Sequence, residues 1–355
     1  MTTLAEVGRM RLVSQRLVPA HGTAAEVVRW MTCTQAQDFP AARIAVALRT
    51  GTRSVGEVTA ALDAGEIVRS WPMRGTLHLV AAEDLGWMLD LTLDRQTRQA
   101  RARHVELGIT AEVYDAAEQV TRDLLGRGPA LRADLMAAWQ AAGVATHDQR
   151  GPHLIGMLAQ RQVICLGPMI ERSQAFVLSE QWITTPRRLE RGEAIVEWAQ
   201  RYFRSHGPAP LKDFLWWTKL LVSEVRPLLD DIREPLGSLM IAGVEYFHDP
   251  LLPDLYAEHR RATARPLLLP SFDEILLGYG DRSPALDDGD IDHVVPGKNG
   301  FFHPTVMHRG RIVATWRRPA VPGDAVTATP FTSLPSAVER ALPRLSARLP
   351  HDRSI

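Results

Sequence analysis

The sequence predicts an α+β protein that is mainly helical, in which three similar units are followed by a different C-terminal segment. Three glycine-led segments begin at Gly51, Gly128 and Gly207, about 78 residues apart, and each continues into apolar residues at helical spacing. A fixed period is typical of a duplicated unit, and this one is long enough for a small domain. We place the three units and the remaining mixed α/β segment, in chain order, at residues 1–108, 109–185, 186–262 and 263–355.

The first unit predicts the order helix, strand, helix, helix, strand, strand. Capping boxes open two of the helices, Thr23-x-x-Glu26 and Ser54-x-x-Glu57. The other elements are a β-prone stretch, a helix and two β-rich runs around a turn: Thr32–Gln37, Pro40–Arg49, Ile67–Trp71 and Thr76–Val80. This is the order of a winged helix-turn-helix, in which the third helix can lie in a DNA groove and the strand pair forms the wing.

The later units repeat this pattern. In the second unit we expect helices at Leu131–Ala142 and Arg150–Gln160 and strands at Val163–Leu166 and Phe176–Leu178. In the third we expect helices at Arg187–His206, Leu211–Leu220 and Glu224–Ile232 and strands at Leu239–Ala242 and Val244–Phe247. In the C-terminal segment we expect a hairpin of Phe301–Met307 with Arg311–Trp316, and a polar helix from about Ser336.

The composition limits where in the cell the protein is expected and which kinds of binding site it can contain. The chain has 41 Lys+Arg and 41 Asp+Glu, and a formal net charge of zero argues against binding polyanions through bulk charge. Cys33 and Cys165 are the only cysteines, which excludes a disulfide framework and a cysteine-rich zinc site. No apolar run approaches the length of about 20 residues that spans a membrane, and the N-terminus has no signal-peptide core. We therefore expect a cytoplasmic protein with no membrane segment.

Gln35-Ala36-Gln37 is the most unusual local feature, because the common catalytic motifs of metalloproteases, P-loop enzymes and serine hydrolases are absent. In an extended segment alternate side chains share a face, so both carboxamides would point one way and Ala36 would face the core. Two carboxamides can position a water molecule or read the edge of a base or a phosphate. The alternative is the polar rim of a short edge strand. The adjacent Asp38 is expected to cap the next helix.

Six residues are candidates for contact with DNA: Arg74, His78, Arg95, Arg98, Arg101 and Arg103. The last four lie in one run of predicted helix, where residues three apart share a face and form a basic ridge that can contact DNA phosphates. The alternative for the ridge is a solvated helix face. Arg74 and His78 belong to the first predicted wing, and their alternative role is a structural hydrogen bond within it.

The chain resembles a known family, the winged-helix bacterial DNA glycosylases typified by AlkZ and YcaQ. The residues that carry the resemblance are Gln35–Asp38 with the helix Pro40–Arg49, Met73–Val80, Leu268–Ser283 and Gly310–Arg317. They occur in the order of the family and span most of the chain. The Gln-x-Gln form matches the AlkZ branch, whereas the YcaQ branch has Gln-x-Asp at this place.

The resemblance implies three tandem winged helices that form a concave DNA-binding surface. It also implies hydrolysis of the N-glycosidic bond of N7-alkylated purines, including bulky adducts and interstrand crosslinks, in DNA repair or self-resistance to alkylating natural products. By position, Gln35 and Gln37 are the implied catalytic pair. The expected partner is double-stranded DNA that contains alkylated purines. We expect no metal and no cofactor, and a monomer, since no dimerisation coiled coil is visible.

Lysine is scarce, and this bears on mechanism. A bifunctional glycosylase commonly uses an amine as nucleophile, but Lys212, Lys219 and Lys298 are the only lysines and none is near Gln35 in sequence. A monofunctional enzyme is therefore expected. The alternatives are a non-catalytic winged-helix DNA-binding protein, such as a regulator or a lesion sensor, and a protein–protein interaction module.

Overall fold

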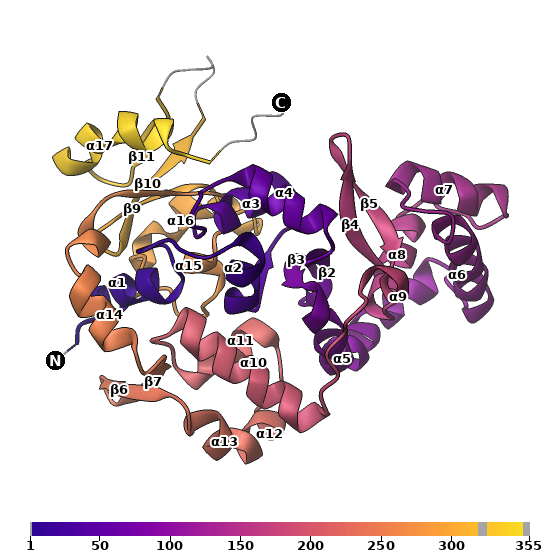
Figure 1. The fold of residues 1–355 in the computed structure, drawn as a ribbon, viewed down its shortest axis with the longest axis horizontal. Coiled ribbons are helices and arrows are strands. Elements are labelled where there is room, and N and C mark those ends of the chain that lie inside the picture. Colours follow the sequence, from indigo (N-terminus) through magenta and orange to yellow (C-terminus); the bar gives the residue numbers. More distant parts are fainter. Residues whose placement is uncertain (1, 319–324, 351–355) are drawn as a thin grey trace. The chain divides into compact units, whose positions relative to one another are not determined.

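The computed structural model describes residues 2–318 and 325–350, and they form a mixed α/β fold that is rich in helix (Figure 1). The chain divides into two compact units. The first, here called the discontinuous unit, consists of residues 1–58 and 196–355, and the second, the central unit, consists of residues 59–195. The division into three winged-helix units and a C-terminal segment stays a prediction.

The discontinuous unit begins with three helices and a short strand. They are α1 (Leu4–Ser14), α2 (Ala24–Met31), β1 (Cys33–Gln35) and α3 (Phe39–Ala47), and α4 (Val55–Asp63) continues into the central unit. Both bonds of the predicted Thr23–Glu26 capping box are present at the start of α2. At the predicted Ser54–Glu57 box, the Ser54 hydroxyl accepts the Glu57 N–H at 3.4 Å.

The chain returns to this unit through helix-rich segments. These are α10 (Arg191–His206), α11 (Leu211–Thr218), α12 (Val222–Val225), η2 (Arg226–Leu228), α13 (Leu229–Arg233), α14 (Leu252–His259), α15 (Glu274–Leu277), α16 (Ile291–Val294) and α17 (Ser336–Ala347). The single helix predicted at Glu224–Ile232 is wrong, because the chain breaks into α12, η2 and α13. Pro227 explains the break, since proline lacks an N–H and its ring clashes with the preceding turn.

Two β structures complete the discontinuous unit. Strands β8 (Leu267–Leu269), β9 (Thr305–His308), β10 (Arg311–Arg317) and β11 (Thr327–Pro330) form a sheet in the order β11-β10-β9-β8, and β6 (Gly237–Ile241) pairs with β7 (Val244–His248). The hairpin predicted around Arg309-Gly310 is confirmed as β9–β10. Both turn residues have positive φ, as a two-residue type I′ turn requires.

The central unit combines helices with two paired hairpins. Its helices are η1 (Ala82–Asp84), α5 (Leu85–Glu106), α6 (Ala111–Leu125), α7 (Arg132–Ala141), α8 (Arg150–Gln160) and α9 (Ser179–Trp182). Its strands, β2 (Ile67–Met73), β3 (Thr76–Ala81), β4 (Ile164–Ile170) and β5 (Ser173–Leu178), lie in the order β3-β2-β4-β5. The helices and strands predicted for this stretch are confirmed within a few residues. Trp139, Leu154 and Phe176 lie in its core.

One further helix begins later than predicted. The sequence predicts a helix from Arg187, but α10 begins at Arg191. Arg187 is held in irregular chain because its N–H donates to the Glu83 carbonyl at 2.8 Å and its guanidinium pairs with buried Asp84 at 2.8 Å. Among the residues with described placement, no helix is both long and apolar enough to cross a membrane.

Candidate active site and nucleic-acid-binding residues

The Gln-x-Gln segment connects β1 to α3 in the discontinuous unit. Gln35 and Ala36 are buried and Gln37 is exposed, so the expected burial of Ala36 is confirmed. The strand ends at Gln35, however, and the two glutamines differ in burial, so the alternation expected to place both carboxamides on one face is not continued through Gln37. The side-chain oxygen of Gln35 accepts a hydrogen bond from the Gln37 backbone N–H at 3.2 Å. Gln35 is therefore folded over the turn that carries Gln37, and the two carboxamides belong to one tight turn.

Asp38 ends this turn and begins the next helix. One of its carboxylate oxygens accepts the Ala41 N–H at 3.1 Å, which confirms the predicted N-cap. The other oxygen accepts the hydroxyl of Ser271 at 2.8 Å. The carboxylate next to the glutamines is therefore occupied with capping α3 and with binding the segment that follows β8.

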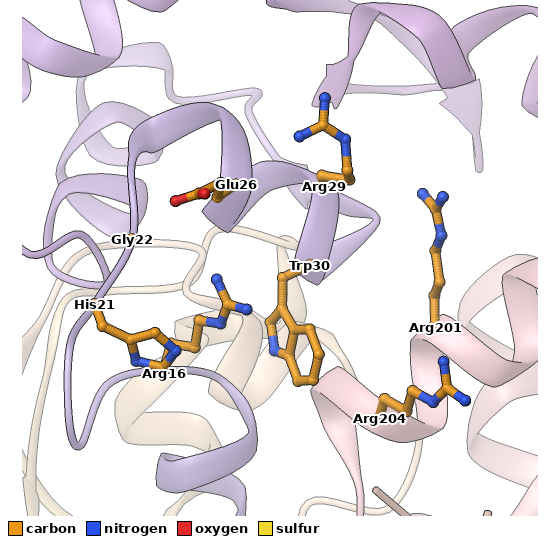
Figure 2. A pocket seen from close by; sticks show the side chains of 8 residues that line it. All are labelled: Arg16, His21, Gly22, Glu26, Arg29, Trp30, Arg201 and Arg204. Carbon is orange, nitrogen blue, oxygen red and sulfur yellow. The ribbon is translucent and has the colours of Figure 1, made fainter. Parts of the chain in front are cut away.

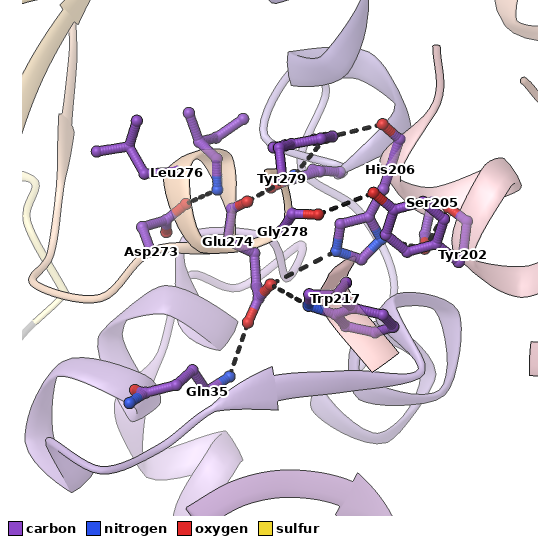
Figure 3. A network of polar contacts seen from close by, with 12 residues as sticks. Gln35, Tyr202, Ser205, His206, Trp217, Asp273, Glu274, Leu276, Gly278 and Tyr279 are labelled. Carbon is purple, nitrogen blue, oxygen red and sulfur yellow. Dashed lines mark hydrogen bonds and ion pairs between the residues drawn. The ribbon is translucent and has the colours of Figure 1, made fainter. Parts of the chain in front are cut away.

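A buried carboxylate, that of Glu274, lies behind the turn (Figure 3). Its Oε1 accepts the backbone N–H of Gln35 at 2.8 Å. Its Oε2 accepts the indole N–H of Trp217 at 3.3 Å and lies 3.6 Å from Nε2 of His206. Figure 3 shows the Gln35 side chain pointing away from Glu274, so the carboxylate holds the backbone of the glutamine and leaves its carboxamide on the other side.

His206 packs beside this carboxylate at the end of α10. Its ring is fully buried, stacks on Tyr202 with centroids 4.7 Å apart, and places Nδ1 2.8 Å from the Ser205 hydroxyl. Burial lowers the pKa of His206, and the neighbouring Glu274 carboxylate opposes that shift. The neutral imidazole is therefore favoured near pH 7, and Glu274 relies on the N–H groups of Gln35 and Trp217 for its hydrogen bonds.

A buried ion pair holds the same short helix, α15, from its other side. Arg49 donates to both carboxylate oxygens of Asp273 at 2.8 and 2.9 Å, and Asp273 also caps α15 by accepting the Ile275 N–H at 3.0 Å. Gln15 accepts from Arg49 at 2.7 Å and donates to the Glu274 carbonyl at 3.3 Å. Helices α1, α3 and α15 are thus connected by bonds that leave Glu274 little freedom to move.

The central unit contains the six residues predicted to contact DNA. Arg74 lies with Gly75 in the β2–β3 turn, where both residues have positive φ. His78 is fully buried, with Nδ1 2.9 Å from the Thr76 carbonyl oxygen and Nε2 3.5 Å from the Arg74 guanidinium. A buried ring does not reach DNA, so His78 fits the alternative given for it, a structural hydrogen bond within the wing.

Helix α5 carries the arginine run, which was predicted to be helical. Arg98, Arg101 and Arg103 are exposed, Arg95 is half-buried, and Arg103 pairs with Glu106 at 2.9 Å. A cavity of about 430 Å³ in this unit is lined by both Arg74 and Arg103, so the turn and the helix contribute to one basic surface.

Two histidines line the same cavity as Arg74 and Arg103. The rings of His104 and His153 meet edge to face with centroids 5.3 Å apart. Burial lowers the pKa of both histidines. The positive charge of this cavity near pH 7 therefore comes from its arginines.

Within residues 2–318 and 325–350, no cluster of three or more His, Cys, Asp or Glu side chains could hold a metal ion. The Cys165 thiol is fully buried, and burial raises its pKa to about 12. The chemistry available at the Gln35–Gln37 turn is that of carboxamides, which donate and accept hydrogen bonds but do not titrate near neutral pH.

Known proteins with a similar sequence and fold are DNA glycosylases. The family described as DNA glycosylase AlkZ-like matches residues 28–350, and the chain belongs to this family. An interstrand DNA cross-link repair glycosylase from Streptomyces sahachiroi is 25% identical over 344 residues, which is 92% of this chain and 90% of that protein. The solved structure of Streptomyces sahachiroi DNA glycosylase AlkZ matches with a TM-score of 0.79 and 26% identity, covering 98% of each chain. The resemblance seen in the sequence is thereby confirmed.

Sequence reasoning missed the residues that hold the Gln-x-Gln turn. Glu274, Asp273 and Arg49 are nearly inaccessible to solvent, yet the sequence suggested no role for any of them. A signal was present, because Asp273-Glu274 interrupts an apolar segment between Leu268 and Leu277. Charged residues in such a setting are costly to bury unless they are paired, so they are candidates for a buried polar network.

Proposed function

We propose that this protein is a monofunctional DNA glycosylase that hydrolyses the N-glycosidic bond of N7-alkylated purines in duplex DNA, including bulky adducts and interstrand crosslinks. Membership of the AlkZ-like family supports the reaction type, and the Streptomyces sahachiroi relative is named for cross-link repair. The observation that carries the proposal is the Gln35–Gln37 turn, with one exposed carboxamide and a buried carboxylate that fixes its backbone.

The chemistry suits a site without a strong base. Alkylation at N7 gives the purine a positive charge, so the C1′–N9 bond breaks with its electron pair moving onto the base, which leaves neutral. The sugar passes through an oxocarbenium-like state, water adds to C1′, and the water proton is released to solvent. Such a reaction needs a positioned water and electrostatic stabilisation of the developing cation more than it needs proton abstraction.

Gln35 and Gln37 can meet these needs together. The bond from the Gln37 N–H to the Gln35 oxygen orients the Gln35 carboxamide before substrate arrives. Gln37 is exposed and can hold the water near C1′, while carboxamide oxygens face the developing positive charge. Neutral bases would react poorly, because nothing at the turn protonates the leaving group.

We further propose that the winged-helix units and the arginines of the central unit bind the DNA duplex. Each predicted winged-helix unit would present a helix and a hairpin to the duplex, and three of them in tandem would form a concave surface. In the central unit the exposed arginines of α5 and Arg74 would contact phosphates. An open surface suits a crosslinked base, which cannot be turned freely out of the helix because it is tied to the opposite strand.

The monofunctional assignment rests on the lysines. Lys212 is exposed and lies 3.9 Å from Asp281, and Lys219 lies over the Trp216 ring at 4.8 Å from its centroid. Neither neighbours the Gln35–Gln37 turn in sequence. We therefore propose hydrolysis by water, which leaves an abasic site and an intact DNA strand.

The test is a single-turnover assay on a duplex that contains one N7-methylguanine. We expect release of the free base, with strand breakage only after alkaline treatment. Borohydride added during the reaction would trap a covalent protein–DNA adduct only if an amine were the nucleophile, and such an adduct would contradict the monofunctional assignment. Tight duplex binding without base release from the methylated or a crosslinked duplex would favour the non-catalytic DNA-binding alternative.

A further inference from the structure

A second basic cavity lies in the discontinuous unit, and the Gln35–Gln37 turn is not part of its lining (Figure 2). It has a volume of about 410 Å³, which is within the range of small-ligand sites. Its lining includes four arginines, one tryptophan and one acid: Arg16, Arg29, Arg201, Arg204, Trp30 and Glu26. They come from the chain after α1, from α2 and from α10, and Figure 2 shows the arginines arranged around Trp30.

The charges of this cavity are incompletely balanced by the protein. The carboxylate of Glu26 is occupied in the α2 capping box, where it accepts the Thr23 N–H at 2.8 Å. Arg201 pairs with Glu197 at 2.7 Å. Arg16 and Arg204 donate no hydrogen bond to any residue in the described ranges of the chain. Among the residues that line the cavity, four are arginines and one, Glu26, is acidic, so the lining carries excess positive charge.

The cationic groups are oriented before any ligand binds. Trp30 is fixed because its indole N–H donates to the Ser14 carbonyl at 2.6 Å, and the Arg16 guanidinium stacks over the Trp30 ring at 4.5 Å. Burial lowers the pKa of Arg16, because the guanidinium has lost part of its water, and the nearby Glu26 carboxylate opposes that shift. A planar, pre-oriented guanidinium of this kind matches the oxygens of a phosphate or carboxylate group, to which it can donate two parallel hydrogen bonds.

The cavity is close to the proposed catalytic turn along the chain. Trp30 lies in the last turn of α2, Thr32 has a φ of 66° that turns the backbone, and β1 ends at Gln35. Five residues span at most about 17 Å, so a ligand in the cavity lies within a few nucleotides of a lesion held at Gln35. Along one strand of a duplex, successive phosphates advance by about 3.4 Å.

We propose that this cavity binds a nucleotide phosphate, and that the phosphate belongs to the DNA strand beside the lesion. The proposal rests on the proposed function for its choice of DNA, whereas the phosphate chemistry follows from the cavity itself. Arg204 and Arg29 would contact the phosphate from two sides, and Arg16 on Trp30 would supply a third, fixed contact. A free nucleotide has the same chemistry and is the other source that the experiment separates.

The experiment measures binding and not excision. We compare wild type, Arg204→Gln and Arg29→Gln with Arg340→Gln, a control that removes an exposed arginine of α17 in the same unit. Affinity for an unmodified duplex is followed by fluorescence anisotropy at several salt concentrations. The logarithm of the binding constant falls linearly with the logarithm of the salt concentration, and loss of one phosphate contact makes this slope less steep by about 0.9. We expect that decrease for each cavity variant and an unchanged slope for the control.

Calorimetric titration with deoxyguanosine monophosphate distinguishes the two sources. If the cavity variants lose binding of the mononucleotide and keep the duplex slope, the phosphate site stands and its ligand is a free nucleotide. If both cavity variants match the control in both titrations, the proposal is wrong. Circular dichroism checks that each variant is folded. Because the two substituted arginines lie in different helices, the same loss in both variants would not result from a local distortion of one helix. Because this duplex carries no lesion, binding is tested separately from excision: a protein that binds it with the expected slopes but releases no base from a duplex with one N7-methylguanine would contradict the proposed function alone.

Discussion

Replacing Glu274 by glutamine tests whether the buried carboxylate holds the Gln35–Gln37 turn. Both oxygens of the native carboxylate accept hydrogen bonds, one from the Gln35 backbone and one from the Trp217 indole. Glutamine has nearly the same shape but only one acceptor oxygen. Its NH₂ group must therefore face one of the two N–H donors. That donor loses its hydrogen bond, and two N–H donors are left facing each other in the protein interior.

The magnitude follows from these contacts. A hydrogen bond to a charged group contributes about 1.5–3 kcal/mol, and a buried donor left without an acceptor costs about 1–3 kcal/mol. We therefore expect Glu274→Gln to lower the free energy of unfolding by about 3–5 kcal/mol. If the amide turns its oxygen to Trp217, the Gln35 N–H loses its acceptor and the turn shifts. A displacement near 1 Å in a catalytic group can reduce the rate about 100-fold.

Two measurements check this prediction. Urea unfolding followed by tryptophan fluorescence gives the change in stability, and single-turnover excision of N7-methylguanine gives the rate of the chemical step. Glu339→Gln, at an exposed position in α17, is the matched control and should change neither. A Glu274→Gln protein within about 0.5 kcal/mol of wild type, with an unchanged excision rate, would refute the role of the carboxylate.

Two further predictions concern the same network. Arg49→Met leaves the buried Asp273 carboxylate without its partner, and we expect a loss of about 3–5 kcal/mol in unfolding free energy, measured with urea; a loss below 1 kcal/mol would contradict the buried pair. The pKa of His206 is lower in the folded protein than its value of about 6.5 in the unfolded chain. Below pH 6.5 the unfolded chain therefore binds this proton more readily than the folded protein does. Its contribution to stability is complete above pH 6.5 and decreases as pH falls. The slope of unfolding free energy against pH below 6.5 should therefore be smaller in His206→Gln than in wild type, by up to about 1.4 kcal/mol per pH unit, and equal slopes would exclude His206 as a source.

Local signals predicted much of the fold. The Thr23–Glu26 box is present at the start of α2, the predicted helix Arg150–Gln160 agrees with α8 at both ends, and Asp38 caps α3 as its position suggested. Each of these features depends on residues within one or two turns of chain. The break at Pro227 was also a local signal, and the prediction of one continuous helix overlooked it.

The support of the candidate site could not be predicted in this way. Glu274 binds the backbone of Gln35 across a separation of 239 residues, and Arg49 reaches Asp273 across 224. No periodicity or spacing connects such positions, because they meet only when the chain returns to the discontinuous unit. The sequence therefore indicated the glutamines, whose chemistry is local, and missed the carboxylate that fixes them.

The most direct test of the proposed activity is base release by a Gln35→Ala/Gln37→Ala double variant. The substrate is a duplex with one N7-methylguanine, and free base is measured under single-turnover conditions beside wild type. Both side chains lie in a turn whose main chain is held by Glu274, so circular dichroism and duplex affinity should match those of wild type. We predict that wild type releases the base and the double variant does not. Release at the wild-type rate by the double variant would contradict the assignment of Gln35 and Gln37 as the catalytic pair.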